Sequence, residues 1–244
     1  MTMSQSTPSS SLTVVLVHGA FADSSSWAGV IERLHAKGTN VIAAANPLRG
    51  LKSDSAYVAA VIDEISGPVL AVGHSYGGAV ISNAATGRSN VVGLVYVCAF
   101  APDEGEVLLE VSGTSKDSVL GAALVSHTYA IGGDTLTEFT LDPAKARDAF
   151  ASDLSDVQAD VIGTVQRPTG ADAFTDPSSA PAWKSLPCWA VVATADRAAG
   201  TDLVRAHAER AGADITEVDG SHLVMLSKPE VVTQVIESAI AKVR

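Results

Sequence analysis

The sequence predicts an α/β fold in which a mostly parallel central sheet of about six strands carries helices on both faces. Short apolar runs rich in β-branched residues alternate with longer amphipathic stretches along most of the chain. A glycine-rich turn joins one of these runs directly to a helical pattern, and one long segment interrupts the alternation. Continuous apolar runs are typical of strands buried on both faces, and their alternation with helices favours a parallel sheet.

Six apolar runs are expected to be strands, at 12–17, 41–45, 69–72, 91–97, 188–193 and, with a weaker pattern, 214–218. Helical patterns lie at 27–37, 53–66, 76–86 and 201–211, and a last helix follows residue 227. Glycine or Gly-Pro stands just after three of these patterns, at Gly38, Gly67-Pro68 and Gly212, where helices commonly end.

The long interruption at 101–186 contains no run with the length and apolarity of a strand. Its weak helical patterns at 104–109, 116–124 and 143–154 predict a mostly helical cap over one end of the sheet. The expected organisation is therefore a disordered polar tail at 1–11, a core formed by 12–100 and 187–244, and a cap insertion at 101–186.

Composition limits the classes of function. Of the 244 residues 47% are hydrophobic and 18% are charged, which gives a sizeable core and excludes a disordered chain. The formal charge is 16 − 27 = −11, and an acidic surface repels phosphate, so we expect no nucleic-acid partner. We expect no membrane partner because no apolar run reaches the length of a spanning helix, about 20 residues.

The remaining compositional signals point to a cytoplasmic protein without a metal or cofactor. The N-terminus lacks a basic segment followed by an apolar one, so no secretion signal is expected. Cys98 and Cys188 cannot form a disulfide framework, and nothing near them has the spacing of metal ligands. Both cysteines are expected to be small buried apolar residues.

The strongest chemical signal is the sequence Gly73-His74-Ser75-Tyr76-Gly77, a G-x-S-x-G pattern between a buried strand and a helix. This context predicts a sharp, strained turn that lifts the Ser75 hydroxyl above the sheet. The turn also aims the Tyr76 amide, at the start of the helix, toward the same space, where a negative charge is favoured. Ser75 is therefore the predicted nucleophile.

A serine nucleophile needs a base, and six histidines are available. His35 and His207 lie in helical patterns that look exposed, His74 is expected to turn away from Ser75, and His18 to brace its own loop. His222 follows the last strand at the same sheet edge as Ser75, where open α/β sheets place their sites, so it is the predicted base. His127 in the insertion is its rival.

Asp196 follows the strand at 188–193 and lies at the same edge, so it is the predicted acid that orients the histidine. Asp103, just after another strand, is the alternative. The oxyanion needs two donors, for which we expect the amides of Tyr76 and of Ala20, with Phe21 as the alternative to Ala20.

These residues resemble the α/β-hydrolase superfamily. The segments HGAFADSSSW, GHSYGG and GSHLVMLSKPE are similar to the branch that holds plant methyl-ester esterases and hydroxynitrile lyases, and more closely to a group of small bacterial hydrolases. The resemblance covers 12–87, 91–100 and 188–244, but only 101–105 of the insertion. It implies an α/β-hydrolase fold, the triad Ser75, Asp196 and His222, and oxyanion donors Ala20 and Tyr76.

Two positions bear on the reaction type. The lyase branch has a threonine where this chain has Gly19, and a lysine after the catalytic histidine where this chain has Leu223, so the resemblance favours an esterase. The chain departs from close bacterial relatives after the pair Asp196-Arg197. Those relatives continue with a β-branched residue and then a proline or hydroxylic residue. This chain has Ala198-Ala199-Gly200, so the resemblance defines the pose of Asp196 less well.

The sequence thus predicts a serine hydrolase that cleaves small-to-medium uncharged carboxylic esters through an acyl-enzyme on Ser75. Alternatives are lactonase, perhydrolase, carbon–carbon cleavage or hydroxynitrile-lyase-like chemistry on the same triad, or a ligand sensor with a hydrolase-like site. The expected partner is a small-molecule ester, and the expected state is a monomer or homodimer. An apolar pocket under the insertion is expected, lined by Phe21, His127, Tyr129, Phe139 and Trp183.

Overall fold

A six-stranded parallel sheet forms the centre of the part of the chain that the computed structural model describes, residues 11–243. The strand order is β2-β1-β3-β4-β8-β9. The strands are β1 (Thr13–Val17), β2 (Asn40–Ala44), β3 (Val69–His74), β4 (Val91–Val97), β8 (Cys188–Ala193) and β9 (Asp214–Val218). All six predicted strands are confirmed, whereas the tail expected at 1–11 lies, except for Ser11, outside the described residues.

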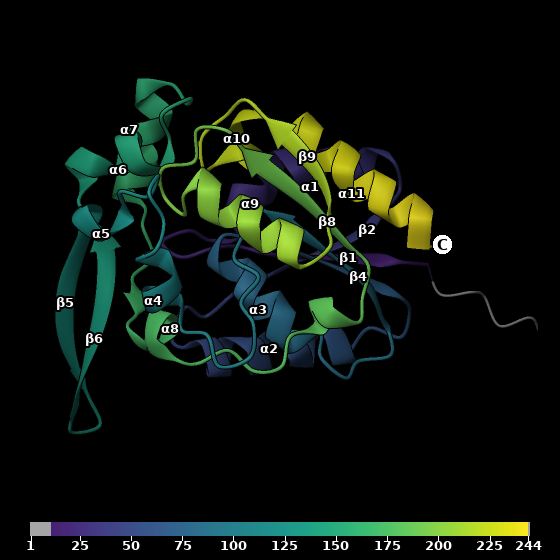
Figure 1. The fold of residues 1–244 in the computed structure, drawn as a ribbon, viewed down its shortest axis with the longest axis horizontal. Coiled ribbons are helices and arrows are strands. Elements are labelled where there is room, and N and C mark those ends of the chain that lie inside the picture. Colours follow the sequence, from purple (N-terminus) through teal and green to yellow (C-terminus); the bar gives the residue numbers. More distant parts are fainter. Residues whose placement is uncertain (1–10, 244) are drawn as a thin grey trace, which may run out of the picture.

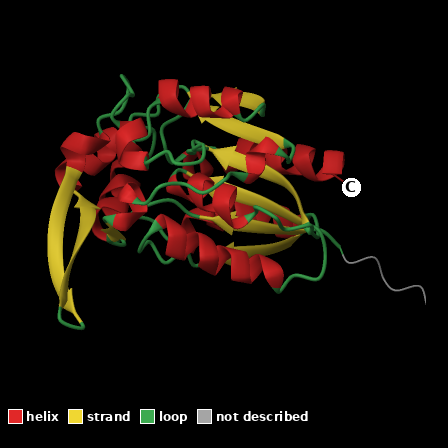
Figure 2. Ribbon diagram, turned by 60° about the horizontal axis from the view of Figure 1, so that its bottom comes forward, coloured by secondary structure: helices red, strands yellow, loops and turns green. Residues whose placement is uncertain are grey.

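Helices cover both faces of this sheet, as predicted (Figure 1). On one face α1 packs against α11, and on the other α2 packs against α3, so the sheet is the middle layer of three (Figure 2). The core helices are α1 (Ala28–Ala36), α2 (Leu51–Asp63), α3 (Tyr76–Ala84), α9 (Thr201–Arg210), α10 (Val224–Ser227) and α11 (Pro229–Val243), and a 3₁₀ turn, Ser24–Trp27, precedes α1. Every residue of β1 and β3 is buried, as expected for strands covered on both faces.

The segment between β4 and β8 lies beyond the carboxyl ends of the core strands (Figure 1). It contains α4 (Leu108–Ser112), α5 (Leu120–Ala123), α6 (Pro143–Phe150), α7 (Asp156–Thr164), α8 (Asp172–Thr175) and a 3₁₀ turn, Ala182–Lys184. It also contains a second sheet of β5 (Leu124–Ile131), β6 (Asp134–Leu141) and β7 (Thr169–Gly170).

The antiparallel hairpin β5–β6 is the part of the insertion that the sequence analysis did not predict, because no run there had the length and apolarity of a strand. Most of its residues are exposed or half-buried, so neither strand shows the continuous apolar run of the core strands. The signal that predicts it is the pair Gly132-Gly133 between two eight-residue runs, LVSHTYAI and DTLTEFTL, in which polar and apolar residues mix. Both glycines have positive φ angles, 59° and 94°, which suits a two-residue hairpin turn.

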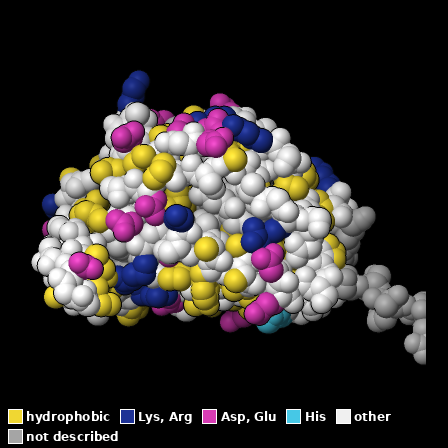
Figure 3. All heavy atoms as spheres, turned by 90° about the horizontal axis from the view of Figure 1, so that it is seen from below, with side chains coloured by type: hydrophobic (Ala, Val, Ile, Leu, Met, Phe, Trp, Pro, Cys, Tyr) yellow, Lys and Arg dark blue, Asp and Glu magenta, His cyan; other side chains and the backbone are white. Residues whose placement is uncertain are grey.

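The surface mixes charge and apolar groups. In the view of Figure 3, apolar side chains form separate patches among acidic and basic ones. Within residues 11–243, no helix combines the length and apolarity that crossing a membrane requires.

Candidate active site

Ser75 lies in the sharp turn between β3 and α3, with φ 52° and ψ −122°. This backbone conformation is costly for a residue with a side chain and persists only when neighbouring structure enforces it. Here the Ser75 amide donates to the carbonyl of Val97 at 3.2 Å, and its own carbonyl accepts from the Phe100 amide at 3.2 Å. The end of β4 thus holds the strained turn in place.

Glycines around Ser75 allow this turn because the chain segments approach too closely for side chains. A Cβ on Gly77 would overlap the carbonyl oxygen of Val17, and a Cβ on Gly73 would overlap that of Gly77. A Cβ on Gly19 would lie 2.8 Å from the Cβ of Ser75. The loop after β1 therefore lies directly against the serine, as the sequence predicts for a loop that supplies an oxyanion donor.

His222 and Asp196 form a buried pair. The Nδ1 of His222 donates to Oδ2 of Asp196 at 2.8 Å, and both side chains are fully buried. With its proton on Nδ1, the imidazole presents an unprotonated Nε2. This Nε2 is buried and has no hydrogen-bond partner among the described residues, so it is available as a base.

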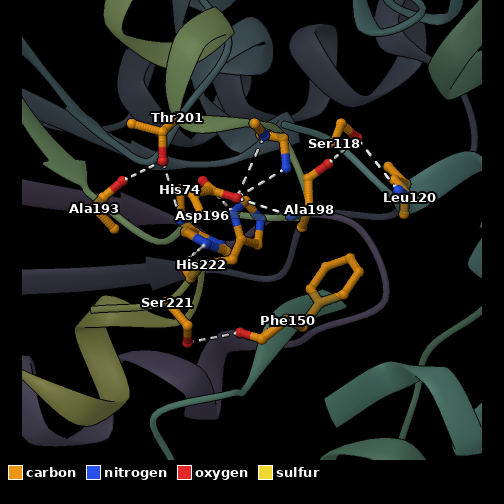
Figure 4. A network of polar contacts seen from close by, with 12 residues as sticks. His74, Ser118, Leu120, Phe150, Ala193, Asp196, Ala198, Thr201, Ser221 and His222 are labelled. Carbon is orange, nitrogen blue, oxygen red and sulfur yellow. Dashed lines mark hydrogen bonds and ion pairs between the residues drawn. The ribbon is translucent and has the colours of Figure 1, made fainter. Parts of the chain in front are cut away.

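The loop after β8 orients the Asp196 carboxylate (Figure 4). Its Oδ1 accepts hydrogen bonds from the amides of Ala198 at 2.9 Å, Ala199 at 3.0 Å and Gly200 at 3.4 Å, which leaves Oδ2 for His222. Gly200 has a φ of 92°, which favours glycine there. The Ala-Ala-Gly sequence, which departs from the bacterial relatives, therefore supplies the amides that fix the acid.

The insertion holds the loops that carry Asp196 and His222. Ser118 donates through its hydroxyl to the Ala198 carbonyl at 2.5 Å. The carbonyl of Phe150 accepts from the Ser221 hydroxyl at 3.0 Å and from the Leu223 amide at 3.2 Å, on either side of His222. The Phe150 ring also meets the His222 ring edge-on, with centroids 5.1 Å apart.

His74, which was expected to turn away from Ser75, packs against His222. Its ring centroid lies 4.6 Å from that of His222, and its Nε2 donates to the His222 carbonyl at 3.1 Å (Figure 4). Complete burial, together with the nearby His222, holds the pKa of His74 well below its ordinary value. His74 is therefore neutral and adds no positive charge beside His222.

Two backbone amides beside Ser75, those of Ala20 and Tyr76, donate no hydrogen bond to any described residue. The alternative donor, the amide of Phe21, is occupied because it donates to Oγ1 of Thr169 at 3.1 Å. Free amides at the start of a helix and in the facing loop are the arrangement that an oxyanion hole requires. Sequence analysis gave no sign that Thr169 engages Phe21.

The rival base and acid lie in other surroundings. His127 is exposed on β5, where its Nε2 meets the Thr140 hydroxyl at 2.9 Å. Asp103 forms an ion pair with Lys184, which lowers the pKa of the carboxyl group. The partner of His222 is therefore Asp196 and not Asp103.

The expectation that His207 is exposed is wrong. His207 lies on the inner face of α9, 4% exposed, and its Nδ1 accepts from the Ala101 amide at 3.0 Å. Burial and the neighbouring Arg210 lower the pKa of His207 from 6.5 to about 4.

His207 should therefore make the fold acid-sensitive. Between pH 6.5 and 4 the unfolded chain binds a proton at this residue that the folded chain does not. The free energy of unfolding therefore decreases as the pH is lowered through that window, and above pH 6.5 this residue does not affect it. The loss is about 1.4 kcal/mol per pH unit. Urea unfolding should be measured at pH 7.5 and at pH 5. The decrease in the free energy of unfolding between the two pH values should be smaller by about 2 kcal/mol in His207→Gln than in the wild type. An unchanged difference would contradict the assignment.

Two apolar cavities lie at the insertion. The first, of about 330 Å³, is lined by parts of the loop after β1, α6, α7 and α10, including Ala20, Phe21, Phe150, Val161, Leu223 and Leu226. The second, of about 500 Å³, is lined by residues of the insertion alone, including Leu109, Val119, Leu120, Leu124, Phe139 and Phe174.

The five residues predicted to line the pocket are distributed differently. Phe21 lines the first cavity and Phe139 the second, whereas neither is lined by His127, Tyr129 or Trp183. Tyr129 accepts a hydrogen bond from Arg49 at 3.2 Å, and the Trp183 indole donates to the Pro102 carbonyl at 3.0 Å. These three side chains contact neighbouring segments, and a role for them in binding the substrate stays a prediction. Phe150 and Phe174, which were not among the five, also line the cavities.

Comparisons with known proteins agree with the fold. No curated protein sequence matches the chain, but several solved structures do. Polyneuridine aldehyde esterase superposes with a TM-score of 0.79 at 20% identity, over 94% of this chain and 99% of that one. Methylketone synthase I from tomato gives 0.78 at 19%, over 96% and 99%, and a methylesterase from Arabidopsis gives 0.76 at 16%, over 94% and 99%. The model of the alpha/beta hydrolase family matches residues 14–235, and the chain therefore belongs to that family.

Proposed function

We propose that the protein is a serine-dependent carboxylic ester hydrolase in which Ser75 is the nucleophile, His222 the general base and Asp196 the orienting acid. The observation that carries the proposal is the buried His222–Asp196 pair, whose free Nε2 belongs to the same sheet edge as the strained Ser75 turn. Such a base can take the proton of a serine hydroxyl, which is otherwise a weak nucleophile.

The reaction proceeds in two halves. Ser75 attacks the ester carbonyl while His222 takes its proton, and the resulting oxyanion is stabilised by the Ala20 and Tyr76 amides. His222 then donates that proton to the leaving alkoxide, which departs as the alcohol and leaves an acyl group on Ser75. Water, deprotonated by His222, attacks the acyl-enzyme, and collapse of the second tetrahedral intermediate returns the proton to Ser75 and releases the acid.

Features around the site support ester chemistry over cyanohydrin cleavage. Gly19 packs so closely against Ser75 that no side chain fits there without movement. Leu223, which follows the base, is buried and apolar and offers no cation to hold a nitrile. The similar structures include proteins named as an esterase and a methylesterase, which agrees with the same chemistry.

The direct test is covalent labelling. A fluorophosphonate should phosphonylate the wild type once, at Ser75, and mass spectrometry of peptides should locate the adduct there. p-Nitrophenyl acetate should be turned over many times per protein molecule. Labelling at another residue would contradict the proposed nucleophile, and labelling of Ser75 without multiple turnovers would favour the ligand sensor.

A further inference from the structure

We propose that Phe21 is a partition between a chamber for the leaving alcohol and a chamber for the acyl group, and thereby determines which esters Ser75 can attack. The chambers are the first and second cavities described above. This inference rests on the proposed function and deepens it, because it assigns the two halves of the ester to different surroundings.

The backbone of Phe21 is fixed on both sides. Its φ is 62°, its amide donates to Thr169 Oγ1 at 3.1 Å, and its carbonyl accepts from the Arg167 amide at 3.2 Å. The positive φ and the two hydrogen bonds restrict where the ring can point. A residue held in this way can act as a wall.

The ring of Phe21 contacts one lining residue of each chamber. It meets Phe150 edge-on, with centroids 6.0 Å apart and planes at 83°. It stacks on Phe174 at 6.2 Å, with planes at 25°. Phe150 lines the first cavity and Phe174 the second, so the Phe21 ring stands where the two approach each other.

The first cavity is on the side of the base. Leu223, which follows His222, lines it, and so does Phe150, whose ring is 5.1 Å from that of His222. In the proposed mechanism Nε2 of His222 must protonate the leaving oxygen, so the alcohol must lie on this side. The volume of this cavity, about 330 Å³, is at the small end of the range for ligand pockets and suits a small or medium alcohol group.

The second cavity is on the Phe174 side of the Phe21 ring, whereas the first is on the Phe150 side. It takes no lining residue from the loop of His222, and its Phe174 packs against the Tyr76 ring at 6.3 Å. Tyr76 supplies an oxyanion donor, so an acyl chain directed past it leaves the carbonyl oxygen on the two amides. This chamber is the larger one, at about 500 Å³.

The charges of the linings define the substrate class. Among residues 11–243, no charged side chain lines the second cavity, and Asp23 is the one charged residue that lines the first. A buried carboxylate without a partner is strongly disfavoured, so acids with a second carboxylate are excluded from the acyl chamber. The substrates are therefore esters of uncharged, apolar carboxylic acids with a small or medium alcohol.

The test uses two ester series, p-nitrophenyl esters of increasing acyl length and acetates of alcohols of increasing length. Phe150→Ala should increase activity on esters of longer alcohols and leave the acyl profile unchanged. Phe174→Ala should increase activity on esters of longer acids and leave the alcohol profile unchanged. Phe21→Ala should shift both profiles. In each case the ratio of kcat/KM for the longest and shortest members should rise by about tenfold, the effect of one or two methylene groups in an apolar pocket.

Controls separate this proposal from a general loss of packing. Leu34→Ala removes a buried side chain of α1 that lines neither cavity, so it should lower stability but keep both profiles. Phe21→Leu should shift both profiles in the same direction by a smaller factor, and serves if Phe21→Ala does not fold.

Two results would overturn the proposal: unchanged profiles in both folded Phe21 variants, or a Phe150→Ala variant that changes the acyl profile instead of the alcohol profile. Failure of the proposed function is recognised separately, because ester hydrolysis would then persist in Ser75→Ala.

Discussion

Replacing Ser75 with alanine is expected to lower kcat for p-nitrophenyl acetate by about 10⁶-fold, the loss seen when a serine nucleophile is removed from a triad. The fold should persist because alanine keeps the Cβ and adopts the same backbone angles at no greater cost. The hydrogen bonds that enforce the turn, from Ser75 to Val97 and from Phe100 to Ser75, use backbone atoms alone. Steady-state kinetics and thermal unfolding measure the two effects.

Ser82→Ala is the matched control for this variant. Ser82 is a buried serine of the same helix, α3, and its hydroxyl donates to the Gly78 carbonyl at 2.8 Å. Its hydroxyl also hydrogen-bonds the buried Tyr96 hydroxyl at 2.8 Å, so its loss should cost about 1–3 kcal/mol of stability while kcat stays near the wild-type value. If Ser75→Ala retained more than about 1% of the wild-type kcat, it would show that another group attacks the ester, since loss of a triad serine costs far more.

The core could be predicted because its strands are covered on both faces. Burial makes strands such as β4 and β8 continuous apolar runs, and the predicted bounds 91–97 and 188–193 match those of the structure. The predicted bounds of β3, 69–72, are shorter than the strand, which continues through Gly73 and His74. At these two residues the apolar run has ended and the G-x-S-x-G pattern has begun, although the strand and its burial continue.

The candidate site could be predicted as far as topology determines it. Ser75, Asp196 and His222 each follow a strand of a parallel sheet, so they reach one edge whatever the details of the loops. The hydrogen bond between His222 and Asp196 agrees with that reasoning. The amides that fix Asp196 depend on loop conformation, which the sequence of three small residues does not determine.

Long-range packing explains what the sequence did not predict. His207 lies on the buried side of α9, where its Nδ1 accepts a hydrogen bond from the Ala101 amide. A polar residue in an amphipathic helix is ordinarily exposed, so the sequence pattern gave no sign of this contact. Which aromatic residues line the two cavities depends on how the insertion folds back on the core. Only the glycine pair of the β5–β6 hairpin was a local signal that could have been used.

Replacing Asp196 with asparagine is expected to lower kcat by about 10⁴-fold while the site keeps its shape. The amides of Ala198, Ala199 and Gly200 all donate to Oδ1, so that position requires an oxygen. The NH₂ group of an asparagine must then take the place of Oδ2 and donate to Nδ1 of His222. The imidazole proton would move to Nε2, and the base would no longer be able to accept the proton of Ser75.

This tautomer change gives Asp196→Asn a signature that a simple loss of stability lacks. Nitrogen-15 NMR of the His222 ring should show the proton on Nδ1 in the wild type and on Nε2 in the variant, with little change in the unfolding temperature. Asp103→Asn is the control because Asp103 also follows a strand but pairs with Lys184, and it should keep near wild-type kcat. If Asp103→Asn were the inactive variant and Asp196→Asn the active one, the acid would be Asp103. The buried pair would then be a structural contact that holds the His222 loop to the end of β8.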